Sequence, residues 1–79
     1  MKLRVGDLYN VDRESFLGTA LYLVLHSDQS DYEVITIYKI DGEITNPMIW
    51  YTSLLTGTSD FMRADLFKDI FIEANHEQK

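Results

Sequence analysis

Apolar positions occur along this chain in short runs that polar residues separate. The three strongest runs are Ala20–Leu25, Val34–Ile40 and Met48–Tyr51. The second and third are rich in β-branched and aromatic residues, which strands prefer. The pattern therefore predicts a mainly β fold with about five short antiparallel strands.

Turn-forming residues indicate where these strands begin and end. The polar stretch 27–31 is typical of a hairpin loop. Asp41-Gly42 predicts a tight hairpin turn, because glycine adopts a positive φ at little cost. The expected strands are a short first one around Leu8 and Tyr9, then Thr19–His26, Tyr32–Ile40 and Met48–Leu54.

The C-terminal part of the chain allows two interpretations. Asp60 could N-cap a helix with apolar residues at i, i+4 and i+8. Alternatively, 63–67 forms one short helical turn, and 70–73 forms a closing strand. The β-branched neighbours of Phe71 favour the second interpretation, which places a helical turn near residues 62–68.

The charges on the third strand suggest which of its faces is solvent-exposed. Glu33 and Lys39 lie on the same face as Ile35 and Ile37, one charge at each end. That face is therefore expected to be the outer one, with both isoleucines partly exposed. Beside other apolar side chains they would form a patch that monomers rarely leave open, which predicts a homodimer. The expected patch comprises Tyr22, Val24, Ile35 and Ile37.

Length and composition indicate a single small domain. The chain has 79 residues and no cysteine, which excludes disulfides and thiolate metal sites. A chain of this size buries only about 60% of its unfolded surface, so aromatic packing has to contribute to its stability. Trp50 and Tyr38 are accordingly expected in the core. The domain is expected to span residues 1–74, with 75–79 as a frayed tail.

The charge distribution bears on the class of partner. The net charge is −6, and Lys39 is the only basic residue between Glu14 and Met62. An acidic surface repels nucleic acid and anionic membranes and favours a basic protein surface. No apolar run approaches the ~18 residues of a membrane span, and the N-terminus lacks the apolar region of a signal peptide. The protein is therefore expected in the cytoplasm, with no membrane association.

Catalytic and ligand-binding motifs are missing from the sequence. His26, Asp28 and Asp31 lie in or beside one expected loop, where they are interpreted as turn residues rather than cation ligands. The segment 56–59 lacks the second glycine and the lysine of a phosphate-binding loop. The sequence therefore predicts a protein that is not an enzyme and that uses no cofactor or metal.

The order of these features resembles the small SH3-like or Tudor-like β-barrels, including short hypothetical proteins of tailed phages. The resemblance covers most of the chain and rests on short motifs. They are Val5-Gly6-Asp7-Leu8, the Gly-led run Gly18–Leu25, the Asp-Gly-closed strand Tyr32–Gly42, Ile49-Trp50, Asp65-Leu66 and Ile70-Phe71-Ile72-Glu73. The resemblance implies an SH3-like barrel that binds proteins or, less often, nucleic acid.

Together these observations favour a non-enzymatic protein-binding module, plausible as a phage-type factor that occludes a basic surface of a host protein. The expected contact residues are Asp28, Asp31, Tyr32, Glu33, Ile35, Ile37, Asp41 and Glu43. A structural or assembly subunit, or a homodimer, is one alternative. Nucleic-acid binding is another, through the basic residues toward the two ends of the chain. These are Lys2, Arg4, Arg13, Arg63 and Lys68.

Overall fold

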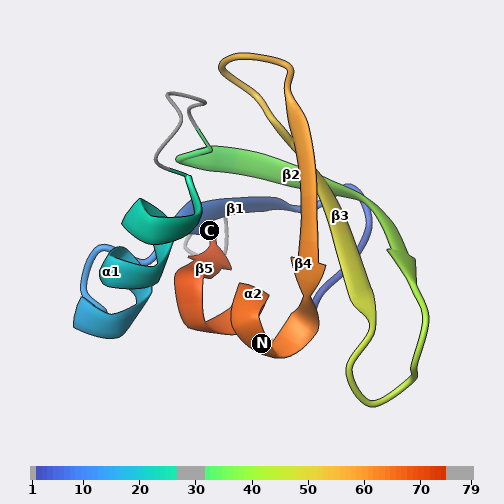
Figure 1. Cartoon of the computed structure of the whole chain (residues 1–79). Coiled ribbons are helices and arrows are strands. Elements are labelled where there is room, and N and C mark those ends of the chain that lie inside the picture. Colours follow the sequence, from blue (N-terminus) through green and yellow to red (C-terminus); the bar gives the residue numbers. More distant parts are fainter. Residues whose placement is uncertain (1, 27–31, 75–79) are drawn as a thin grey trace.

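A computed structural model describes residues 2–26 and 32–74 of the chain (Figure 1). The loop predicted at 27–31 and the tail predicted at 75–79 lie outside these residues. The elements in chain order are β1 (Leu8–Val11), α1 (Phe16–Leu25), β2 (Val34–Asp41), β3 (Met48–Ser53), β4 (Ser59–Arg63), α2 (Ala64–Ile70) and β5 (Phe71–Glu73). The prediction of a mainly β fold with five antiparallel strands is confirmed.

The five strands form one sheet in the order β4-β3-β2-β1-β5. No residue separates β4 from α2 or α2 from β5, so the helix carries the chain from one edge of the sheet to the other. The sheet curves into a small barrel, and α2 lies between the ends of β4 and β5 (Figure 1). Of the two interpretations of the C-terminal part, the helical turn followed by a strand is therefore confirmed.

The core lies on the inner face of this curved sheet and is rich in aromatic rings. The rings of Tyr9 and Phe67 meet edge to face with centroids 5.4 Å apart, and those of Phe67 and Phe71 lie 4.7 Å apart. Isoleucines of β2, β3 and α2 fill the space around these rings. A chain without disulfides thus obtains its apolar burial from large rings packed in close contact.

The predicted strand Thr19–His26 is wrong, because this segment forms helix α1. The Ser15 side chain caps the helix by accepting a hydrogen bond from Gly18 N at 2.9 Å. The helix also packs closely against α2: a Cβ on Gly18 would lie 2.3 Å from the Asp69 carbonyl oxygen. A nearly continuous apolar run has no clear period, so the sequence pattern alone did not distinguish a strand from a helix.

The predicted faces of the third strand are also wrong. Ile35 and Ile37 are fully buried, opposite Ser53 and Tyr51 of β3. The register shifts at a bulge between Ile37 and Lys39. A bulge adds one residue to one strand and reverses which side chains face inward beyond it. Lys39 therefore lies on the outer face although Ile37 lies on the inner one, and the two charges did not mark a common face.

The same register places Trp50 and Tyr38 outside the core, contrary to prediction. Trp50 pairs with Lys39 and Phe61 on the outer face and is half-buried, and Tyr38, at the bulge, is exposed. The Lys39 ammonium lies 5.3 Å from the centre of the indole ring, within the range of a cation–π contact.

Strand β4 was not predicted. The sheet still has five strands because β4 is present and the expected strand Thr19–His26 is not. Its sequence, Ser59 to Arg63, follows a polar loop and begins with two polar residues. Met62 is buried opposite Ile49, while Phe61 is exposed. Because β4 is an edge strand with one free side, its pattern is more polar than that of its neighbour β3.

Candidate protein-binding surface

Helix α1 exposes a continuous apolar surface. Phe16 is 89% exposed and Val24 is 73% exposed, and Leu17 and Leu23 are exposed as well. At 100° per residue these four positions fall within an arc of about 120° around the helix. We call them the α1 face. No residue of α1 is charged, so nothing on this face other than the backbone favours water.

The opposite side of α1 is attached to the sheet through a cluster of aromatic rings. His26, which caps the helix C-terminus, is buried, and its ring lies 4.5 Å from that of Tyr32 and 4.9 Å from that of Tyr22. Its Nε2 lies 3.1 Å from the Tyr51 hydroxyl. Burial, aided by the nearby Asp60 carboxylate, raises the pKa of Tyr51. His26 is therefore a packing residue that holds the end of α1 on β3, rather than a residue of an exposed turn.

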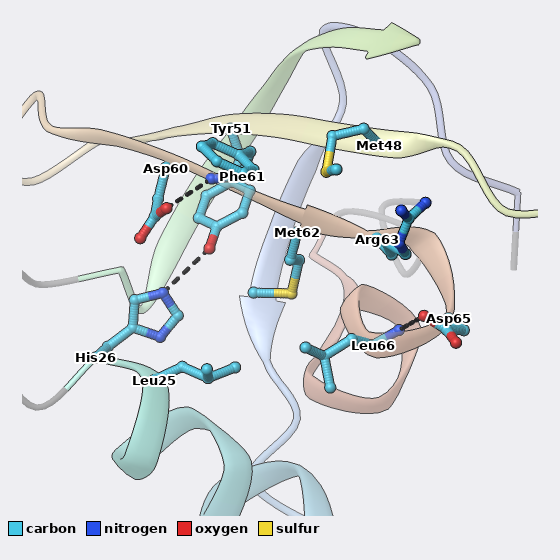
Figure 2. A pocket seen from close by; sticks show the side chains of 10 residues that line it. All are labelled: Leu25, His26, Met48, Tyr51, Asp60, Phe61, Met62, Arg63, Asp65 and Leu66. Atoms are coloured by element: carbon cyan, nitrogen blue, oxygen red, sulfur yellow. Dashed lines mark hydrogen bonds between the residues drawn. The ribbon is translucent and has the colours of Figure 1, made fainter. Parts of the chain in front are cut away.

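A pocket of about 530 Å³ lies between the end of α1, strand β4 and the first turn of α2 (Figure 2). We call it the β4 pocket. Its apolar side chains are Leu25, Met48, Phe61, Met62 and Leu66. Its polar side chains are His26, Tyr51, Asp60, Arg63 and Asp65. Leu25 also belongs to α1, so the pocket begins where that helix ends.

The structure separates the acidic residues that were predicted to act together. Glu33 precedes β2 and forms an ion pair with Arg13. Asp41 ends β2, 3.8 Å from the Lys39 ammonium, and Glu43 follows it in the exposed hairpin. Eight strand residues span about 25 Å, so these carboxylates do not form one patch. Asp28 and Asp31 lie outside the described residues, and a binding role for the acidic residues stays a prediction.

The three apolar residues of the predicted contact set are buried. Ile35, Ile37 and Tyr32 all belong to the core, and the Tyr32 hydroxyl donates a hydrogen bond to the Ser59 carbonyl oxygen at 3.3 Å. Their expected exposure, and the dimer patch drawn from the two isoleucines, are therefore wrong: these side chains face the inner side of the curved sheet, and the bulge beyond Ile37 turns only Lys39 outward. Of that patch, only Val24 is well exposed.

The residues of the α1 face other than Val24 were not candidates in the sequence. The signal that could have indicated them is Ser15, a residue typical of a helix N-cap, followed by a run that contains one alanine and four leucines, which are strong helix formers. Read with a helical period, the run 16–25 has too many apolar residues for one buried side, and the surplus has to face outward.

The basic residues are partly brought together. Lys2 and Lys68 line a second hollow of about 290 Å³ with Leu3, Ile40 and Ile44. Arg4 lies 3.9 Å from the Asp7 carboxylate, and Arg13 pairs with Glu33. Two of the five basic residues thus lie beside acids of the same chain, which weakens the field that they present to a phosphate.

Within residues 2–26 and 32–74, no group of three or more histidine, aspartate and glutamate side chains could hold a metal ion. In the same part of the chain, neither helix has the length and apolarity that crossing a membrane requires. Comparison of the chain with protein-family models, with curated proteins and with solved structures gives no match.

Proposed function

We propose that this protein is a non-enzymatic protein-binding module of the cytoplasm that attaches to its partner through the α1 face. The observation that carries the proposal is the exposure of four large apolar side chains on one uncharged ten-residue helix. Contiguous apolar surface of this kind is uncommon on monomers and is typical of protein interfaces. Phe16, an aromatic residue at the start of the helix, is the natural anchor.

The acidic character of the chain indicates the sign of the partner's surface. With a net charge of −6, long-range attraction favours a basic protein over an acidic one or over nucleic acid. Binding by the α1 face would cover the partner's surface, as expected of a phage-type factor that occludes a site on a host enzyme. The charges speed the encounter, and the apolar helix maintains the contact.

A homodimer or an assembly contact is the alternative use of the same helix. Because α1 carries no charge, two copies could pair along it without bringing like charges together. Light scattering separates the two uses: a monomer at high micromolar concentration leaves the α1 face free for a foreign partner.

The test is affinity capture from an extract of the cells that express the protein, with quantification by mass spectrometry. The variant Phe16→Ser/Val24→Ser removes the apolar surface at exposed positions. The matched control Leu54→Ser/Leu55→Ser removes two exposed leucines of the β3–β4 loop. At least one protein should be captured by the wild type and by the control but not by the α1 variant. That protein, once purified, should also bind the purified wild type directly. Identical capture by all three proteins would contradict the proposal.

A further inference from the structure

Strand β4 has a free edge, and the register shows which of its backbone groups face outward. Thr58 O accepts from Ser53 N, and Ala64 N donates to Pro47 O, both at 2.8 Å. Hydrogen-bonded and non-bonded pairs alternate along an antiparallel ladder. The backbone groups of Asp60 and Met62 therefore face β3, whereas those of Ser59, Phe61 and Arg63 face away from it. The Ser59 carbonyl oxygen already accepts from the Tyr32 hydroxyl at 3.3 Å, so an added strand would use the groups of Phe61 and Arg63.

The outward N–H at the middle of this edge is held by a side chain. Phe61 N donates to Asp60 Oδ1 at 2.8 Å, the bond drawn beside the pocket in Figure 2. The carboxylate thus takes the position that the carbonyl of a neighbouring strand would occupy. An acid on an edge strand prevents unselective pairing, and here it blocks the edge with a group that can rotate away.

The β4 pocket lies along this same edge and contains side chains from both faces of the strand. Asp60 and Met62 belong to the inner face, and Phe61 and Arg63 to the outer face. Successive side chains of an added strand also point to alternate faces. One side chain of such a strand would enter the pocket between Leu25 and the inner-face residues Asp60 and Met62. The next side chain would pack on Phe61.

We propose that an extended, apolar and basic segment of a partner protein adds to β4 as a sixth strand, with one apolar side chain in the β4 pocket. A carbonyl of the segment replaces the Asp60 carboxylate on Phe61 N–H. The released carboxylate then pairs with a lysine or arginine of the segment. The pocket contains the carboxylates of Asp60 and Asp65 against the single guanidinium of Arg63, so its formal charge favours a cation.

This inference rests on the proposed protein-binding function and specifies the form of the bound segment. Leu25 ends α1 and lines the pocket, so a partner that covers the α1 face can extend a strand into it. The two contacts remain separable, because the α1 face and the β4 edge consist of different residues.

The test uses 12-residue peptides selected from a random displayed library on the immobilised full chain and then synthesised. Each peptide is remade with one backbone N-methyl group at successive positions, and its affinity is measured by fluorescence polarisation. Two variants accompany the wild type: Leu25→Ser in the pocket, and Leu55→Ser as the matched control, a comparably exposed leucine in the β3–β4 loop. Amide chemical shifts report where each peptide binds.

We expect the selected peptides to contain lysine or arginine beside apolar residues. N-methylation should weaken binding ten-fold or more at every second position and little at those between, the pattern of a strand paired on one side. Leu25→Ser should weaken binding at least five-fold while Leu55→Ser leaves it within two-fold, and shifts should concentrate at 59–63. Equal sensitivity at all positions, a helical period, binding elsewhere, or no selected peptide would overturn strand addition. The capture experiment with Phe16→Ser/Val24→Ser is read independently, so the α1 contact can stand if this one fails.

Discussion

Trp50 and Phe61 stack across the β3–β4 pair with ring centroids 4.6 Å apart, on the face of the sheet turned away from the core. The indole Nε1 is buried, and it has no hydrogen-bond partner among the residues that the structure describes. The stack is thus an apolar contact outside the main core. Its one polar atom, the indole Nε1, is buried without a hydrogen bond to the described residues and therefore does not stabilise the fold.

Replacing Trp50 with alanine should cost about 2 kcal/mol of unfolding free energy, less than the 3–5 kcal/mol typical of a core aromatic. Trp50→Phe keeps a ring on Phe61 and removes the unpartnered N–H, so it should cost less than about 1 kcal/mol. Urea denaturation followed by circular dichroism measures both. Complete unfolding of Trp50→Ala would show that the outer stack contributes as much as the core.

Gly18→Ala should displace or unfold helix α1. The added methyl group would lie 2.3 Å from the Asp69 carbonyl oxygen, a backbone atom of α2 that cannot rotate away. We expect a loss of about 2 kcal/mol or more, which is typical of overpacking. Gly6→Ala is the comparison: its φ of 95° strains an alanine by about 1 kcal/mol, but nothing lies within 4 Å of the added Cβ, so it measures backbone strain without overpacking. If thermal melts give Gly18→Ala a melting temperature equal to or higher than that of Gly6→Ala, the close contact between α1 and α2 is contradicted.

Tyr51 predicts a loss of stability in alkali. Its pKa is raised by burial, so the folded protein keeps the phenol proton where the unfolded chain releases it, above about pH 10. This contribution to stability is complete below pH 10 and falls by up to about 1.4 kcal/mol per unit above it. Tyr51→Phe should cost about 1 kcal/mol at neutral pH, through loss of the His26 bond, and should reduce the alkaline slope.

Urea titrations between pH 9 and 11.5 measure this slope. Burial also raises the pKa of Tyr9, so part of the slope should remain in Tyr51→Phe. The exposed residue Tyr38 supplies the control, Tyr38→Phe, which should behave as the wild type. If unfolding free energy falls with pH equally steeply in the wild type and in Tyr51→Phe, the folded and the unfolded protein release the Tyr51 proton over the same pH range, which would contradict the prediction.

Reversing the charges of Asp41 and Glu43 should slow association with a basic partner. Both side chains are exposed near the β2–β3 hairpin, and exposed charges act over a screening length of ~8 Å at physiological ionic strength. We expect Asp41→Lys/Glu43→Lys to lower the association rate several-fold at low salt, and raised salt to reduce the difference. Stopped-flow mixing with the captured partner measures this. A rate unaffected by the double change would assign these acids to solubility alone.

Much of the fold could be predicted because its signals are local. Asp41 ends β2 and Gly42, with a φ of 97°, begins the turn toward β3, although the connection of residues 42–47 is longer than the predicted tight turn. The closing strand around Phe71 is present as β5, although it begins one residue later than expected because Ile70 ends α2. These features depend on the conformational preferences of a few residues, which no distant contact overrules.

The rest depended on tertiary contacts that the sequence pattern does not encode. The bulge after Ile37 reverses the phase of β2, and no residue type marks it. Helix α1 forms where Gly18 meets Asp69, about fifty residues away in the chain. The candidate site was missed for the same reason: once 16–25 is a helix, its surplus leucines face outward, and the isoleucines expected outside fill the core.

The absence of linking residues between β4, α2 and β5 has a consequence for engineering the protein. One residue inserted into α2 would rotate everything after it by about 100°, turning Ile70 and Phe71 out of the core and moving β5 off its register with β1. The β2–β3 hairpin imposes no such phase, and Ile44 at its tip is 97% exposed. An epitope tag, a fluorophore or a second domain therefore belongs at 43–45, and the segment from Ser59 to Glu73 is best transferred to another scaffold whole.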